Sequence, residues 1–230
     1  MTRRTWVALT TALAFSLAFG WSTRAGAQVH WDASAQAGVM RRVLANRPSG
    51  GKDAGFGPVG QLEGHIALLP LVRFGAYLGY DISPLGGDAS ARDITWGGAR
   101  VKVMSPWPRG SFRLWLFFGF GYDGVYQRST SAVRNVPGPI GMPTLRAETV
   151  VHGAGGGFFE IPYGIGASYK LRKPWELCAE LGGRSGFGFS GSAYEAGPRV
   201  TSPGIPDEHA LPAGNDRFGI ALTVGVLVDL

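Results

Sequence analysis

The sequence contains no long apolar segment beyond its first 27 residues, no second cysteine and no cluster of basic residues. Its longest uncharged apolar segments, Leu114–Tyr122 and Gly219–Val228, are too short for a transmembrane helix of about 20 residues. They suit a tilted transmembrane strand of about 9 to 11 residues instead. Cys178 is alone, which excludes an internal disulfide. Because Lys and Arg are scattered singly, we expect no nucleic-acid partner.

The first 27 residues are typical of a cleaved secretory signal peptide. Two arginines precede an apolar stretch, and the small residues Ala25-Gly26-Ala27 precede the expected cleavage site before Gln28. An uncleaved transmembrane anchor would need a longer apolar run. Removal of this segment takes three arginines from the 22 Lys and Arg of the chain, leaving 19 against 16 Asp and Glu. We therefore expect residues 28–230 to form one domain of nearly balanced charge.

After this segment, apolar residues alternate with small, polar or charged residues in eight runs, which is the pattern of strands with one apolar face. The clearest run is 112–123. The least regular is 94–104, where we expect a bulge near Gly97-Gly98 to reset the phase. The eight runs cover residues 29–39, 60–68, 72–82, 94–104, 112–123, 159–171, 175–184 and 217–230.

The connections between these runs alternate between short and long. The short ones lie around residues 69–70, 106–110 and 172–174, and the long ones are 41–56, 83–92, 127–155 and 188–214. Short periplasmic turns and long external loops are the pattern of transmembrane barrels. An even number of strands then places both termini on the periplasmic side.

The expected fold class is therefore all-β, an eight-stranded antiparallel up-and-down transmembrane β-barrel. A soluble barrel of the lipocalin type would also alternate, but its solvated rows would hold more Lys, Glu and Thr than the glycine-rich polar rows of this chain. Small residues suit the crowded interior of an eight-stranded barrel. Acids and bases are nearly balanced in these rows, so we predict an ion-pair network that plugs the lumen. Its members are Asp32, Glu63, Arg73, Asp81, Arg100, Lys102, Arg113, Asp123, Glu160, Lys170, Glu176, Glu180, Arg184, Arg217 and Asp229.

The last eight residues, Thr223-Val224-Gly225-Val226-Leu227-Val228-Asp229-Leu230, place a polar residue and a glycine before alternating hydrophobic residues. In this and in its strand pattern, the chain resembles the small outer-membrane barrel superfamily that includes the OmpA transmembrane domain, OmpX and OmpW. The resemblance implies an integral outer-membrane protein whose terminal segment is read by the barrel-assembly machinery through Thr223, Gly225, Val228 and Leu230. The family prefers an aromatic last residue, and Leu230 departs from it.

Some eight-stranded barrels are enzymes that act on lipid A. The histidines of this chain do not match the catalytic pattern of the deacylase type. Such barrels use a His-x-Ser pair, and none of the four histidines has Ser two positions on. The palmitoyltransferase type uses dispersed His, Asp and Ser at the outer end, where only His152 and Ser190 are expected here. Neither metal-ligand spacing nor a phosphate-binding loop is present in the sequence. We expect neither catalysis nor a cofactor.

The leading functional hypothesis is a structural or surface-interaction role in the outer membrane, without a named extracellular ligand. The alternative is a narrow channel or a lateral transporter for small or hydrophobic solutes, because Pro162 interrupts hydrogen bonding within an expected strand. A lipid A-modifying enzyme is the third hypothesis. The first and third long connections are basic, so they are expected to contact lipopolysaccharide phosphates. These residues are Arg41, Arg42, Arg47, Lys52, Arg128, Arg134 and Arg146.

Overall fold

The computed structural model describes residues 30–44, 55–84, 91–106, 110–127, 130–136, 145–151, 154–191, 199–200 and 216–229. The expected signal peptide lies outside the described residues. No helix among the described residues is long and apolar enough to cross a membrane.

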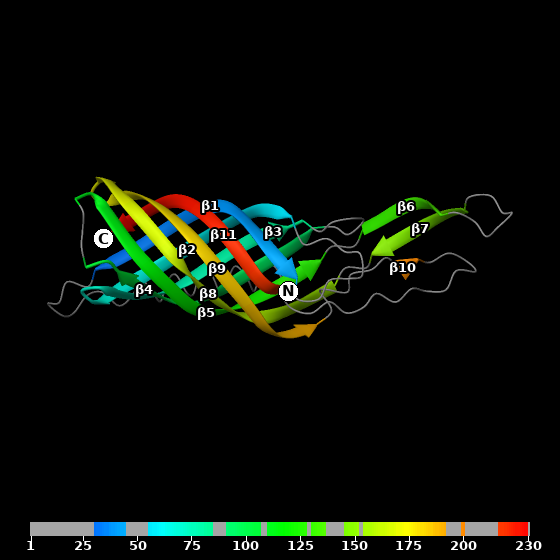
Figure 1. Cartoon of the computed structure of the whole chain (residues 1–230), viewed down its shortest axis with the longest axis horizontal. Helices are drawn as coiled ribbons and strands as arrows, with labels where there is room; N and C mark the ends of the chain where they lie inside the picture. The colour runs from blue at the N-terminus through cyan, green and yellow to red at the C-terminus, as the bar shows by residue number, and fades with distance from the viewer. Residues whose placement is uncertain are drawn as a thin grey trace, which may run out of the picture. The chain divides into compact units, whose positions relative to one another are not determined.

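Eight antiparallel strands close into a barrel in the order β1-β11-β9-β8-β5-β4-β3-β2 (Figure 1). Each strand pairs with its neighbour along the chain within the barrel, and β1 pairs with β11 to complete the closure. The prediction of an eight-stranded antiparallel up-and-down barrel is confirmed. The barrel strands are β1 (Trp31–Leu44), β2 (Phe56–Leu69), β3 (Val72–Ser83), β4 (Arg92–Met104), β5 (Phe112–Gln127), β8 (Ala154–Arg172), β9 (Trp175–Gly191) and β11 (Asp216–Asp229).

The two ends of the barrel differ in their connections. At one end, which faces left in Figure 1, short turns join β2 to β3 and β8 to β9. We call this the turn end. At the opposite end, the loop end, β1 ends at Leu44 and β11 begins at Asp216.

The strands reach further toward the loop end than the apolar pattern predicts. β1 extends to Leu44, β4 begins at Arg92, and β9 extends to Gly191. Above the apolar band, outward residues are no longer consistently apolar, so the contrast on which the sequence prediction depends is lost. The expected bulge near Gly97-Gly98 is wrong, because β4 pairs with both neighbours there without a shift of register.

A second, three-stranded sheet falls within segments that the sequence predicted as loops. It has the order β10-β7-β6 and consists of β6 (Thr130–Val136), β7 (Leu145–Val151) and β10 (Arg199–Val200). Its strands belong to the third and fourth long connections. The alternation pattern of the sequence did not reveal these strands.

Alternation along each strand separates two faces of the barrel. In β5, Leu114, Leu116 and Phe118 are exposed, whereas Trp115 and Phe117 are buried. Within the apolar band the other strands follow the same parity, with apolar side chains outward and mostly polar, small or aromatic residues inward. A lipocalin-type barrel would have the opposite arrangement, so this alternative is wrong.

Candidate functional site

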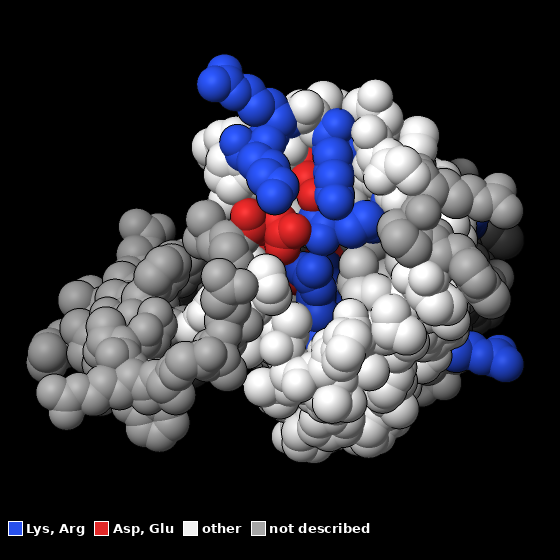
Figure 2. Space-filling view, turned by 90° about the vertical axis from the view of Figure 1, so that its left-hand side faces the viewer, with Lys and Arg blue, Asp and Glu red and all other residues white. Residues whose placement is uncertain are grey.

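The lumen holds most of the buried charge of the described residues. Figure 2, which looks at the turn end, shows acidic and basic side chains gathered in the mouth of the barrel, while the surrounding barrel surface is free of them over most of its visible area. Buried charges are tolerated when they are paired and hydrogen-bonded. They form three clusters along the barrel, which we name the loop-end, central and turn-end clusters.

Arg42 is the hub of the loop-end cluster. From β1 its guanidinium contacts three aspartates on three other strands: Nη2 lies 2.7 Å from Asp81 Oδ2, and Nη1 lies 2.8 Å from Asp123 Oδ2 and 3.0 Å from Asp216 Oδ2. Arg92 Nη1 adds a second contact to Asp216 at 3.1 Å. All five side chains are buried. Arg42 therefore connects β1 to β3, β5 and β11.

Arg184 and Glu160 complete the loop-end cluster on its central side. Arg184 Nη1 lies 2.6 Å from Glu160 Oε1, which also accepts a hydrogen bond from the Tyr77 hydroxyl at 2.8 Å. The Arg184 guanidinium carbon lies 3.5 Å from the centre of the Trp96 ring, a cation–π contact. Trp96 in turn donates from Nε1 to Asp81 at 3.0 Å. Aromatic and charged side chains thus fill the lumen together.

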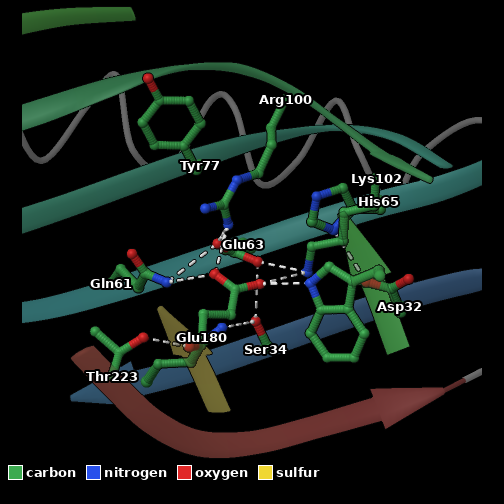
Figure 3. A network of polar contacts seen from close by, with 12 residues as sticks. Asp32, Ser34, Gln61, Glu63, His65, Tyr77, Arg100, Lys102, Glu180 and Thr223 are labelled. Carbon is green, nitrogen blue, oxygen red and sulfur yellow. Dashed lines mark hydrogen bonds and ion pairs between the residues drawn. The ribbon is translucent and has the colours of Figure 1, made fainter. Parts of the chain in front are cut away.

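Glu63 and Glu180 form the acidic half of the central cluster, from β2 and β9 (Figure 3). Lys102 Nζ lies 2.7 Å from Glu63 Oε2 and 3.3 Å from Glu180 Oε1. Arg100 pairs with Glu63 and lies 2.9 Å from Glu180 Oε2. Trp115 Nε1 donates to Glu180 at 2.9 Å, and Figure 3 shows the Gln61 amide pointing toward both carboxylates. Two cations and two carboxylates balance at the centre of the lumen.

Asp32 anchors one half of the turn-end cluster. It pairs with Arg73, and its Oδ1 lies 3.0 Å from His65 Nδ1. Both Asp32 and His65 are buried, whereas Arg73 is partly exposed. These contacts connect β1, β2 and β3 at the mouth of the barrel.

Arg113 joins the other half of the turn-end cluster. Its guanidinium pairs with Glu176 and lies 2.9 Å from Asp229 Oδ2. The Ser168 hydroxyl donates to Glu176 at 2.6 Å. This half therefore connects β5, β8, β9 and β11. Arg73 Nη1, 3.5 Å from Asp229 Oδ1, links the two halves.

Inward glycines make room for the large side chains of the lumen. A Cβ at Gly79 would lie 2.1 Å from the Trp96 ring, and a Cβ at Gly166 would lie 2.3 Å from the Trp115 ring. Glycine in the polar rows is therefore required by close packing. The glycine-rich rows were correctly read from the sequence as the crowded interior of the barrel.

Two small cavities of about 10 Å³ each lie beside the clusters. One is lined by Arg100 and Glu180 of the central cluster and by Arg184 of the loop-end cluster. The other is lined by Lys102 together with Asp32 and Arg113 of the turn-end cluster. A space of this size holds roughly one water molecule. Each of these two cavities is therefore too small for a solute larger than water.

Thirteen of the fifteen residues predicted for the lumen lie in these clusters. Lys170 and Arg217 do not, because their side chains are exposed. In β11 the pairing with β1 shifts register between Val43 and Leu44, so Asp216 points inward instead of Arg217. The thirteen are Asp32, Glu63, Arg73, Asp81, Arg100, Lys102, Arg113, Asp123, Glu160, Glu176, Glu180, Arg184 and Asp229.

The sequence prediction missed four participants: Arg42, Arg92, Asp216 and His65. Arg42 was predicted to contact lipopolysaccharide, and this is wrong, because only 2% of its side chain is exposed. The alternation of the strand indicates its inward position, because Arg42 lies an even number of residues from Asp32 on the same strand and therefore shares its face. Arg92 likewise shares the parity of Arg100 on β4.

The other predicted lipopolysaccharide contacts are distributed differently. Arg41 is exposed, and its guanidinium carbon lies 5.7 Å from the centre of the Phe56 ring. Arg134 of β6 pairs with Ala147, and Arg146 of β7 pairs with Asn135. Three residues lie outside the described part of the chain: Arg47, Lys52 and Arg128.

The predicted assembly signal lies on β11. Thr223 faces the lumen and donates to Gln36 Oε1 at 2.7 Å. A Cβ at Gly225 would lie 2.0 Å from the Ala35 carbonyl oxygen, so glycine permits the close approach of β1. Val228 is half-buried, and Leu230 lies outside the described residues.

No family model matches the sequence, and no curated protein matches it. Solved structures of similar fold include the following two. The Neisserial surface protein A is 9% identical, with a TM-score of 0.51 over 87% of this chain and 97% of that one. A major outer membrane protein from Thermus thermophilus is 14% identical, with a TM-score of 0.52 over 89% of this chain and 100% of that one.

The chain has the fold of the small outer-membrane β-barrels. The resemblance inferred from the strand pattern is thus confirmed at the level of the fold. In an outer-membrane barrel the outward apolar rows face lipid, and the inward polar rows face the lumen. The exposed and buried rows of this chain follow that arrangement.

Proposed function

We propose that the protein is an integral outer-membrane barrel with a structural or surface-interaction role and a lumen closed to ions. The observation that carries this proposal is the filled lumen, in which buried ion pairs lie at the loop end, at the centre and at the turn end of the barrel. A conducting pore needs a continuous wet path, and a transporter needs room for its solute. The packed interior favours a plug over both.

The turn end lies on the periplasmic side in this proposal, and the long connections lie outside the cell. Support comes from the alternation of short and long connections, which in barrels of this kind follows the side of the membrane. The barrel-assembly machinery would read the end of β11 during insertion. The deacylase type of lipid A enzyme is not favoured, because no His-x-Ser pair occurs in the sequence.

Purified, folded protein in a planar lipid bilayer is expected to give no stepwise ion conductance. The reason is that each ion would have to displace paired charges such as Lys102 with Glu63 and Arg42 with Asp81. A general diffusion porin added to the same bilayer is the positive control. Reproducible steps of one size from the folded barrel alone would contradict the plug and favour the narrow channel.

Lipopolysaccharide is the proposed partner at the loop end, where its phosphates would meet exposed arginines. Among the described residues, Arg41 is a predicted contact whose side chain is exposed. Guanidinium groups bind phosphate in a charge-assisted, bidentate way. Arg42 is excluded from this set by its burial. The remaining candidates are Arg47, Lys52, Arg128, Arg134 and Arg146.

Replacement of Arg41 and these five residues together by Gln is expected to lower the gain in melting temperature that added lipopolysaccharide produces. Strand content, measured by circular dichroism, should stay the same because the substitutions lie outside the lumen clusters. The matched control is the wild-type protein with added phospholipid in place of lipopolysaccharide. An unchanged gain in the six-residue variant would exclude these side chains as the contact.

A further inference from the structure

The β2–β3 turn presents an unusual run of exposed apolar side chains at the turn end. Leu68 is 65% exposed, Leu69 is 56% exposed and Leu71 is 40% exposed, with Pro70 between them. Turns that face water are dominated by Gly, Pro, Asn, Asp and Ser. If this turn faced water, its three leucines would expose apolar surface, and burial of that surface would lower the free energy. The apolar outer face of the barrel therefore continues through this turn.

The β8–β9 turn has the opposite character. Lys170, Arg172 and Lys173 are all exposed, and Figure 2 shows basic side chains projecting from the rim of this end. Close to them, Tyr169, Leu171 and Trp175 are also exposed. Tyr and Trp beside Lys and Arg is the composition of a membrane–water interface. The apolar band therefore ends at this turn and meets a set of cations.

The two turns lie on opposite sides of the barrel. In the closed order β1-β11-β9-β8-β5-β4-β3-β2, the β2–β3 pair is four positions from the β8–β9 pair in a ring of eight strands. At the turn end, one side of the barrel is thus apolar and the opposite side carries exposed cations. The leucines favour the acyl chains whereas the cations favour the headgroups, so the two turns favour different depths in a membrane.

We propose that the barrel sits tilted in the membrane, with the β8–β9 turn bound to the phosphates of anionic phospholipids and the β2–β3 turn immersed among their acyl chains. Both turns contact the same phospholipid leaflet in this proposal. Lys170, Arg172 and Lys173 supply the charge complementary to the headgroup phosphates, and the leucines supply the apolar complement. The inference rests on the proposed function, because it requires the barrel to be inserted in a bilayer.

The depth of each turn can be measured with a fluorescent probe on single cysteines in a Cys178→Ala background. The three sites are Leu69→Cys, Lys173→Cys and, as an insertion control, Leu116→Cys in the middle of the outer face of β5. The barrel is reconstituted in phosphatidylethanolamine vesicles that contain phosphatidylglycerol. We expect acyl-chain spin labels to quench the probes at 69 and 116, and aqueous iodide to quench the probe at 173.

The outcomes separate the two proposals. If the probe at 116 is not quenched by acyl-chain labels, the barrel is not inserted and the proposed function fails. If 116 is quenched but 69 is as accessible to iodide as 173, the tilt is overturned while the membrane location stands. Disulfide-linked dimers through Leu69→Cys would show that a second copy covers the turn, which also overturns the inference.

Lipid selectivity tests the cationic side. Adding phosphatidylglycerol to phosphatidylethanolamine vesicles should raise the melting temperature of the wild-type barrel, and the Lys170→Gln/Arg172→Gln/Lys173→Gln variant should lose most of that gain. The matched control is Arg217→Gln, which removes an exposed arginine at the loop end that is not among the proposed lipopolysaccharide contacts. It should keep the gain. Equal gains in the triple variant and the wild type would overturn phosphate binding at this turn.

Discussion

Replacing Arg42 with Met is expected to destabilise the folded barrel by about 3–5 kcal/mol, the usual cost of removing one partner from a buried ion pair. Arg42 is buried and contacts Asp81, Asp123 and Asp216 at 2.7 to 3.0 Å. Without its charge, three carboxylates from β3, β5 and β11 would face one another away from water. Urea unfolding in phospholipid vesicles, followed by tryptophan fluorescence, measures the free energy of unfolding.

Arg41→Met is the matched control, because Arg41 is the preceding residue on the same strand and its side chain is exposed. Its effect is expected to stay within about 0.5 kcal/mol, as for ordinary surface substitutions. Arg42→Lys should give an intermediate loss, since an ammonium lacks the planar fork that reaches several carboxylates at once. Equal effects of Arg41→Met and Arg42→Met would contradict the assignment of Arg42 as the hub of the loop-end cluster.

The barrel itself could be predicted because period-two alternation survives wherever one face meets lipid. In β5, Leu114, Leu116 and Phe118 are exposed while Trp115 and Phe117 are buried, and the same parity is already visible in the sequence. Acids and bases in the inward row, such as Glu63 and Lys102, had to find partners there. The partner of each charge depends on how β1 closes against β11. The residue pattern of a single strand does not show this.

The loop-end cluster was harder to predict because its strands run past the apolar band. Next to Arg42, the outward residue is Arg41, so polar residues occupy both faces and the alternation disappears. The inward position of Asp216 could not be predicted from alternation alone. The register shift between Val43 and Leu44 reverses which residues of β11 face inward at its start. A local irregularity of one residue moves a side chain to the other face of a sheet.

The sheet of β6, β7 and β10 was missed for a different reason. Its strands are 7, 7 and 2 residues long, and the segment between β6 and β7 is rich in Pro and Gly. Short runs bounded by such residues carry little period-two signal. The long third connection was therefore predicted as a loop, although Thr130–Val136 pairs with Leu145–Val151 along its whole length.

Replacing Glu180 with Ala is expected to destabilise the barrel by about 3–5 kcal/mol as well. Glu180 accepts from Arg100, Trp115 and Gln61 at 2.9 to 3.1 Å, and Lys102 lies 3.3 Å away. Its removal would leave two buried cations to share the single carboxylate of Glu63. The Trp115 indole and the Gln61 amide would each lose an acceptor.

Glu180→Gln and Leu181→Ala resolve the causes of this loss. Glu180→Gln keeps the shape and one acceptor oxygen but removes the charge, so its loss should fall between wild type and Glu180→Ala. Leu181 is the next residue on β9 and faces outward, so truncation there removes no partner of the central cluster. Urea unfolding in phospholipid vesicles measures all three variants. If Glu180→Gln were as stable as wild type, the charge of Glu180 would contribute nothing to the central cluster, and hydrogen bonding alone would account for its conformation.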